Sequence, residues 1–383
     1  MTSHFFCAKM GAKIFLIKGV FPMLKNTAYR LQHEKKLTVG FFGGSVTEGS
    51  GASSWNNTSW RANITRYLKE TYPEAEITAV NAAVGGTGTD LGLFRLGHDL
   101  LQYHPNLVFI EFATNDSENP RDEQFKCYES CLRQILTKDP TTEIVCAFTM
   151  TKAIEEKLLA FGDFSSRTAE ATLAYHYGLD MVNIGEHLRM AVAKDGGDWM
   201  KYTIDNVHPN DDGYLVMTEA MKNALVRLLA ETPDALQEKA VPAPYCEESV
   251  IPYGDLVEMR DIIGGVDGWT FVDKPFKWRF PHYVSADGIG SELTYEFEGR
   301  DFGIYHVADN ESGILEMTLD GKETKLVCLW DEPCKSYSRG SYKIPFKNLE
   351  KGRHTVKLRV SEQKHAESLG NKCSIFALLV SNY

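Results

Sequence analysis

The sequence predicts an α/β domain with a five-stranded parallel sheet, followed by an antiparallel β-sandwich. Through roughly the first 230 residues, short apolar runs alternate with helical patterns, which is typical of a parallel sheet with right-handed crossovers. From residue 269 onward, strand patterns recur without helices between them, which is typical of a β-sandwich. A chain of 383 residues is also too long for one ordinary domain and about right for two.

The first of the two domains contains the alternating elements. Its strands are expected at residues 37–42, 76–80, 107–112, 143–150 and 179–183. Its helices are expected at residues 61–72, 91–103, 122–138, 165–177 and 211–229. The sandwich strands are expected at residues 292–298, 301–308, 313–319, 324–330, 341–346, 354–361 and 373–381. Asp320-Gly321, between two of these strands, is a strong hairpin signal.

Changes in composition divide the chain into four segments. Residues 1–34 form an N-terminal extension, residues 35–232 the α/β domain, residues 233–255 a linker and residues 256–383 the sandwich. The linker is rich in charge, punctuated by proline and without periodicity. We therefore expect it to be a linker between the two domains.

The N-terminal segment is apolar between residues 5 and 21, but Lys9, Lys13 and Lys18 interrupt it. No apolar stretch of secretory or transmembrane length remains, so we expect neither a signal peptide nor contact with a membrane. Met23 is an alternative start, which would make residues 1–22 an extension of the gene model. Eight scattered cysteines without a Cys-x-x-Cys pair fit reduced thiols, and we expect a cytoplasmic protein.

The net charge and the spacing of the cysteines restrict which ligands we expect the protein to bind. A formal net charge of -11 argues against nucleic acid, because nonspecific affinity there comes from basic residues. Cys127 and Cys131 share a helix face, but no further ligand completes a metal site, so we expect them to be buried apolar side chains. A homo-oligomer is compatible with this composition.

A strand followed by two glycines and a serine marks the first candidate site. The strand at residues 37–42 leads into Gly43-Gly44-Ser45, and the glycines allow a turn tight enough to expose Ser45. In open α/β sheets, active-site groups collect beyond the carboxyl ends of the strands. The alternative is a plain turn in which Ser45 caps the next helix.

Two more segments supply groups that a serine nucleophile needs. Asp205 and His208 stand three residues apart, and a serine hydroxyl requires a base whose ring is oriented by a third group. Asn115 follows the apolar strand at residues 107–112, where its amide can donate a hydrogen bond to an oxyanion. The alternatives are a helix-start turn for the first pair and an Asx turn for Asn115.

Four segments together resemble the SGNH (GDSL-type) hydrolase family. They are Gly-Gly-Ser-Val-Thr-Glu-Gly at 43–49, Asn-Ala-Ala-Val-Gly-Gly-Thr at 81–87, Ala-Thr-Asn-Asp at 113–116 and Asp-Asn-Val-His at 205–208. Gly44 replaces the acidic residue of the common Gly-Asp-Ser, and Ala113 replaces a glycine. The resemblance covers roughly residues 35 to 230 and implies a flavodoxin-like three-layer α/β/α fold.

The resemblance also implies a mechanism. Ser45 would be the nucleophile of a serine esterase, His208 its base and Asp205 the group that orients the ring. The oxyanion would be held by the N–H groups of Ser45 and Gly86 and by the Asn115 amide, with Gly85 as the other possibility for the glycine. No metal or organic cofactor is required.

The substrate prediction rests on the polar segments around the nucleophile. A small acyl pocket with a polar, aromatic-dotted rim suits an acetyl group on a sugar, such as acetylated mannan or xylan fragments. We expect Trp60, Asp116 and Trp199 on this rim. A lipase, lysophospholipase or thioesterase is the alternative, and a non-catalytic carbohydrate-binding protein is the alternative of another class.

The sandwich resembles carbohydrate-binding modules and jelly-roll accessory domains, which agrees with a sugar substrate. Trp269, Trp278 and Trp330 could stack on sugar rings. Tryptophans in a β-sandwich are more often core residues, and we favour the core for each of them.

Overall fold

The α/β domain is built on the expected parallel sheet. The computed structural model describes residues 24–162, 164–246, 251, 253–261, 268–276 and 280–382. The sheet strands are β1 (Lys36–Gly43), β2 (Glu76–Asn81), β3 (Leu107–Glu111), β4 (Glu143–Ala147) and β5 (Asp180–Val182), in the order β2-β1-β3-β4-β5. All neighbours pair in parallel, so the predicted flavodoxin-like arrangement is confirmed.

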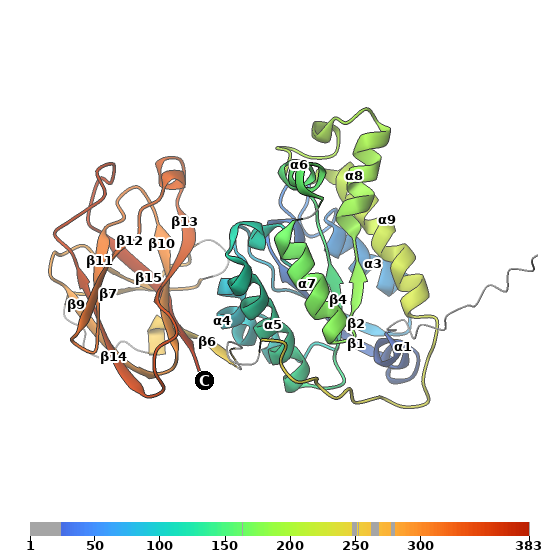
Figure 1. The fold of residues 1–383 in the computed structure, drawn as a ribbon, viewed down its shortest axis with the longest axis horizontal. Helices are drawn as coiled ribbons and strands as arrows, with labels where there is room; N and C mark the ends of the chain where they lie inside the picture. Colours follow the sequence, from blue (N-terminus) through green and yellow to red (C-terminus); the bar gives the residue numbers. More distant parts are fainter. Residues whose placement is uncertain are drawn as a thin grey trace, which may run out of the picture.

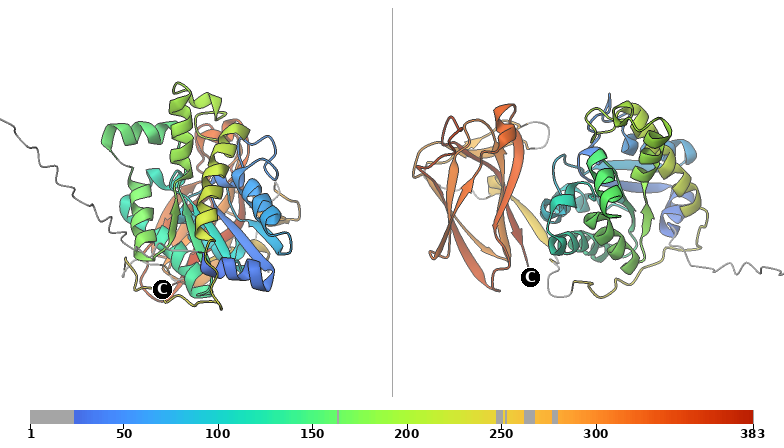
Figure 2. Two further views of the ribbon diagram at one scale, coloured as in Figure 1. Left: turned by 90° about the vertical axis from the view of Figure 1, so that its right-hand side faces the viewer. Right: turned by 45° about the horizontal axis from the view of Figure 1, so that its top comes forward.

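Helices cover both faces of this sheet (Figures 1 and 2). One face carries α3 (Trp60–Thr71) and α9 (Asp211–Leu228), with α8 (Ile184–Lys194) packed on α9. The other face carries α4 (Thr89–Asp99), α5 (Arg121–Lys138) and α7 (Ser165–His176). The shorter elements of this domain are α2 (Ser45–Glu48) and the 3-10 helices Leu101–Tyr103, Asn115–Glu118 and Trp199–Lys201.

Among the longer helices of the described residues, two were not expected from the sequence. They are α6 (Lys152–Phe161) and α8, which follow β4 and β5. The side chain of Thr151 accepts from the N–H of Ile154, and that of Asn183 accepts from the N–H of Glu186. Each helix therefore begins at an N-cap side chain that satisfies one of its free N–H groups.

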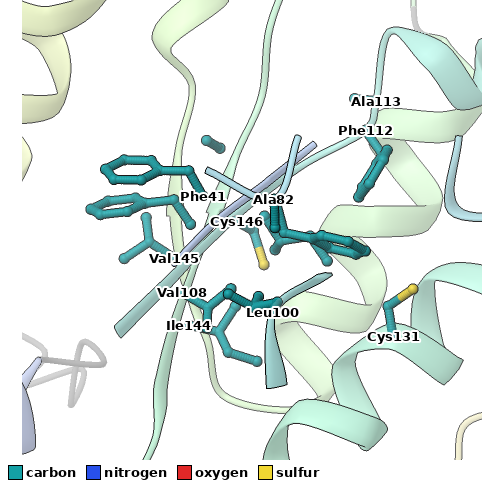
Figure 3. Packing of buried hydrophobic residues seen from close by; sticks show 14 of the residues in the cluster. Phe41, Ala82, Leu100, Val108, Phe112, Ala113, Cys131, Ile144, Val145 and Cys146 are labelled. Atoms are coloured by element: carbon teal, nitrogen blue, oxygen red, sulfur yellow. The ribbon is translucent and has the colours of Figure 1, made fainter. Parts of the chain in front are cut away.

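The core between the layers is apolar and aromatic (Figure 3). Strands β3 and β4 are buried along their whole length, which explains their continuous apolar sequences. Phe41 of β1 stacks on Phe109 of β3 with ring centroids 5.1 Å apart, and Trp60 meets both rings edge-on.

Residues 24–34 pack into this core. They form α1 (Lys25–Tyr29) and a π-helical turn (Arg30–Glu34), and Leu24, Ala28 and Leu31 are buried in the same cluster as the sheet. These residues therefore form part of the α/β domain, although the sequence analysis assigned them to an extension. The expectations on residues 1–22 fall outside the described residues.

The C-terminal domain has two antiparallel sheets, as expected. The larger sheet contains β13 (Arg339–Phe346), β10 (Asp301–Ala308), β15 (Cys373–Ser381), β8 (Tyr283–Ala286) and β7 (Thr270–Val272) in that order, with β6 (Gly254–Glu258) paired to β15. The smaller sheet contains β12 (Glu323–Cys328), β11 (Ile314–Leu319), β14 (Arg353–Val360) and β9 (Glu292–Glu298). Asp320 and Gly321, both at positive φ, turn β11 into β12 and confirm the hairpin.

The larger sheet packs against the α/β domain through α4 (Figure 1). Tyr305, Val307, Phe376 and Leu379 belong to the hydrophobic cluster that fills the α/β domain. The two domains therefore share one apolar core across their contact. Trp269 and Trp330 are each 7% exposed, which confirms a core position, and Trp278 lies outside the described residues.

The linker also contacts the α/β domain. The N–H of Lys239 donates to the carbonyl of Pro140, Arg133 donates to the carbonyl of Pro242, and the N–H of Cys246 donates to Glu129. Across the described ranges, none of the helices has the length and apolar character needed to cross a membrane.

Candidate active site

Ser45 stands at the start of α2, directly beyond the carboxyl end of β1. The turn before it requires a glycine, because a Cβ on Gly44 would lie 1.9 Å from Oδ1 of Asn115. The close approach of Gly44 to Asn115 thus joins the turns that follow β1 and β3. It brings the serine and the asparagine amide to the same edge of the sheet.

His208 reaches Ser45 from the loop before α9. Its Nε2 lies 2.9 Å from Ser45 Oγ, and its Nδ1 lies 2.7 Å from Oδ2 of Asp205. The other oxygen of Asp205 accepts from the N–H groups of Val207, at 3.0 Å, and His208, at 2.7 Å. A hydroxyl, an imidazole and a carboxylate therefore form one hydrogen-bonded series, which can remove a proton from the hydroxyl.

The carboxylate of Asp205 is stabilised in its charged form. Partial burial acts to raise its pKa, but the hydrogen bonds from the backbone and ring of His208 and from the backbone of Val207 outweigh that effect. The pKa of Asp205 consequently lies below its ordinary value. The group facing His208 Nδ1 is thus an anion over the whole neutral range.

The two glycines that could bind an oxyanion differ in their hydrogen bonds. The N–H of Gly85 donates to Oε2 of Glu48 at 3.0 Å. Gly86 has φ +71°, and within the described residues its N–H donates to no protein acceptor. Gly86 therefore has a free donor beside the pocket, whereas the donor of Gly85 is already engaged.

A buried glutamate is hydrogen-bonded to the short helix that begins at Ser45. Glu111, at the end of β3, accepts from Thr47 at 2.7 Å and from Thr149 at 2.5 Å. Burial raises the pKa of Glu111 to about 7, although both threonine hydroxyls and the Gly44 backbone act to lower it. Its two hydrogen bonds tie the helix that begins at Ser45 to the end of β4.

Ser45 opens into a pocket of about 580 Å³ that lies between the domains. The α/β domain contributes Ser45, Gly86, Asn115, His208 and Trp55. The sandwich contributes Phe276, Phe280, Tyr305, Tyr337 and Arg339. The four segments singled out in the sequence thus meet at one pocket, and a fifth contribution comes from the other domain.

Residues 41–216 match the family model described as GDSL-like Lipase/Acylhydrolase family. The α/β domain belongs to this family. The chain is accordingly a carboxylic ester hydrolase. No curated protein sequence gives a significant match.

The fold of both domains is also found in a solved two-domain esterase, CEX, described as active on acetylated mannans. The structure co-crystallised with mannopentaose aligns with a TM-score of 0.79 and 20% identity, covering 94% of this chain and 95% of that chain. A second structure of this two-domain esterase aligns with a TM-score of 0.80 and 20% identity, covering 94% of this chain and 96% of that chain. The α/β domain and the sandwich thus occur together in a known two-domain fold.

Three residues expected on the substrate rim of this GDSL-like hydrolase are buried elsewhere. Trp60 is 0% exposed and packs in the core of the α/β domain. Asp116 is 1% exposed and accepts from the N–H and hydroxyl of Thr89. Trp199 is 2% exposed and donates from its indole N–H to Glu155. The rim prediction was wrong for all three, because each side chain turns inward from a rim segment.

Sequence reasoning missed several residues of the pocket. Trp55 is 43% exposed and lines it from the loop in which Trp60 had been singled out. Glu48 lines it and holds Gly85, and the serine motif itself contained this residue. The sandwich residues gave no signal, because their position depends on how the two domains dock.

The described residues contain no group of three or more His, Cys, Asp or Glu side chains arranged to hold a metal ion. Cys127 and Cys131 are 6% and 0% exposed in the core of α5, as expected for apolar side chains. Burial raises the pKa of the Cys131 thiol well above its ordinary value.

Proposed function

We propose that this hydrolase is a serine esterase that removes O-acetyl groups from acetylated oligosaccharides, such as fragments of mannan or xylan. The observation that carries the proposal is the hydrogen-bonded series from Ser45 through His208 to Asp205 at the floor of a pocket between two domains. A pocket of about 580 Å³ has room for an acetylated sugar.

The reaction proceeds through an acyl-enzyme. His208 Nε2 takes the proton of Ser45 as Oγ attacks the acetyl carbonyl, and Asp205 stabilises the imidazolium that forms. The N–H groups of Ser45 and Gly86 and the Asn115 amide bind the oxyanion of the tetrahedral intermediate. The sugar hydroxyl departs with the proton from His208, and water then releases acetate by the same steps.

The preference for a sugar ester rests on the lining of the pocket. Trp55 on the hydrolase side and Tyr337 on the sandwich side are about half exposed, and exposed aromatic faces stack on the apolar faces of sugar rings. The two-domain esterase of the same fold is described as active on acetylated mannans. We extend that substrate class to this chain.

The experiment compares acetate release from acetylated manno- and xylo-oligosaccharides with hydrolysis of p-nitrophenyl octanoate and of a lysophospholipid. We expect the acetylated sugars to be preferred and the Ser45→Ala variant to be inactive on all substrates. A preference for long acyl chains would indicate a lipase or lysophospholipase. Equal activity of Ser45→Ala and the native chain would exclude the mechanism.

A fluorophosphonate probe gives an independent readout of the nucleophile. The native chain should be labelled stoichiometrically and the Ser45→Ala variant should not be labelled. A native chain that binds acetylated sugar but neither reacts with the probe nor releases acetate would be a carbohydrate-binding protein instead.

A further inference from the structure

The loop that carries Gly86 joins β2 to α4 and is held from two sides. On the side of Ser45, the N–H of Gly85 donates to Glu48, and within the loop the hydroxyl of Thr87 donates to the carbonyl of Val84 at 2.8 Å. These contacts fix the beginning of the loop. Its end is fixed by different residues.

The end of the loop lies between two carboxylates. A Cβ on Gly88 would lie 2.2 Å from Oδ1 of Asp116 and 2.9 Å from Oδ1 of Asp90. Asp116 also accepts from the N–H and the hydroxyl of Thr89, the first residue of α4. The exit of the loop is therefore close-packed, and a shift of either carboxylate would move it.

The second carboxylate is bound by the sandwich. The hydroxyl of Tyr342, on β13, lies 2.8 Å from both oxygens of Asp90. The backbone N–H of Gly88 faces the same hydroxyl and acts to lower its pKa. A residue from the other domain thus contacts the loop two positions after Gly86.

We propose that Tyr342 is a positioning residue for the esterase reaction, which holds Asp90 and Gly88 so that the N–H of Gly86 points at the oxyanion. This inference rests on the proposed function. It assigns the sandwich a part in the chemical step, without contact between Tyr342 and the substrate.

The physical reason is the narrow range over which an oxyanion donor is effective. Such a donor must lie roughly 2.7 to 3.1 Å from the oxyanion, and displacements of about 1 Å cost large factors in rate. Burial already raises the pKa of Asp90, and the hydrogen bond from Tyr342 is the largest effect that opposes it. Without the hydroxyl, Asp90 and the loop beside it lose their fixed position.

The test uses the full chain with a Tyr342→Phe substitution and p-nitrophenyl acetate as the substrate. With active sites counted by fluorophosphonate labelling, we expect kcat to fall about tenfold and KM to change less than twofold. This small ester does not need the sugar contacts of the sandwich. A loss in kcat therefore reports on the reacting groups.

Glu258→Gln is the matched control. Glu258, on β6, lies 3.2 Å from His98 near the opposite end of α4 and 3.0 Å from His282 of the sandwich. This variant therefore removes the charge from a polar contact between the same sandwich and the same helix. We expect its kcat to match that of the native chain. An unchanged kcat in Tyr342→Phe, or an equal loss in both variants, would overturn the proposal.

Asp90→Ala approaches the same contact from the other domain and covers the case in which Tyr342→Phe folds poorly. Where both variants fold, they form a double-mutant cycle. If Tyr342 acts through Asp90, then Asp90→Ala should lower kcat by a similar factor, and the double variant should lose little more. Multiplicative losses would overturn the proposal. An active Ser45→Ala variant would instead refute the proposed function itself, so the two failures are distinguishable.

Discussion

The two walls of the pocket are built in different ways. The catalytic wall (Ser45, Gly86, Asn115 and His208) presents polar groups beyond the carboxyl ends of the strands. The aromatic wall (Phe276, Phe280, Tyr305 and Tyr337) presents rings of the sandwich, where Phe280 packs edge-on against Tyr305 with centroids 4.8 Å apart. In the proposed reaction, the catalytic wall positions the reacting atoms, and the aromatic wall offers a flat apolar surface.

This difference implies a division of labour. Hydrogen bonds hold the groups of the catalytic wall in place, and a displacement of about 1 Å there can cost about a hundredfold in rate. Aromatic faces accept sugar rings in several registers, so they contribute to affinity more than to rate. Substitutions on the two walls should therefore change different kinetic constants, and the predictions below test that separation from the largest effect to the smallest.

The largest effect is expected from Asp205→Asn. The amide keeps an acceptor for the backbone N–H groups but loses the charge that stabilises the imidazolium. We expect kcat for p-nitrophenyl acetate to fall about a thousandfold with KM nearly unchanged. A loss below about tenfold in steady-state kinetics would show that Asp205 only shapes the turn.

Asn115→Ala should have the next largest effect. The loss of one oxyanion donor typically lowers kcat about a hundredfold. Steady-state kinetics on the small ester, with thermal unfolding as the check on folding, measure it. A change confined to KM would contradict the placement of Asn115 on the catalytic wall.

Tyr337→Ala tests the aromatic wall. We expect KM for acetylated manno-oligosaccharides to rise about tenfold, because about 1 kcal/mol or more of stacking is lost per aromatic face. Tyr175→Ala is the control, since Tyr175 is an 83% exposed tyrosine outside the pocket. If the effect of Tyr337→Ala appeared in kcat on p-nitrophenyl acetate instead, the division between the walls would be wrong.

Glu170→Met tests the scaffold behind the catalytic wall and should have the smallest effect on activity. Glu170 is 1% exposed, and neither of its carboxyl oxygens has a hydrogen-bond partner among the described residues. Burial, and then Asp116 and Glu111, raise the pKa of Glu170 well above its ordinary value. The folded protein therefore holds this proton more tightly than the unfolded chain.

The sign of the pH dependence follows. As the pH rises above about 4.5, the unfolded chain releases the proton while the folded protein retains it, so stability is lost until the folded pKa is reached. Glu170→Met should thus stabilise the protein by about 1 to 3 kcal/mol at pH 8 and by less at pH 5. Thermal unfolding at both pH values measures this, and an equal shift at both would contradict it.

The matched control for that substitution is Glu129→Met. Glu129 is equally buried, but its carboxylate accepts from the backbone N–H of Cys246 and from other donors. We expect this variant to lose about 2 kcal/mol or more of stability, because buried donors are left unpaired. A gain in stability from Glu170→Met and a loss from Glu129→Met would show that the two buried carboxyl groups differ because only Glu129 has hydrogen-bond partners.

Much of the catalytic wall could be predicted from the sequence. Ser45, Asn115 and His208 each follow a strand or precede a helix in a short motif, and the carboxyl ends of parallel strands meet at one edge of the sheet. Local sequence therefore carries most of the information on where these residues lie. The family and the five-stranded sheet could be predicted for the same reason.

The aromatic wall could not be predicted, because its place depends on how two domains dock. Tyr337 lies nearly 300 positions from Ser45 in the sequence. The prediction of Trp60 on the rim was wrong for a local reason, and Trp55 was not singled out. Both stand in or beside the same polar loop, and only the start of α3 at Trp60 turns that side chain into the core.

The contact between Gly44 and Asn115 limits how this enzyme can be engineered. A design that restored the Gly-Asp-Ser motif of the family that the chain resembles would replace Gly44 with aspartate. Here the added atoms would occupy the volume of the asparagine amide. A Gly44→Asp substitution would therefore displace Asn115 as well as alter the turn before Ser45.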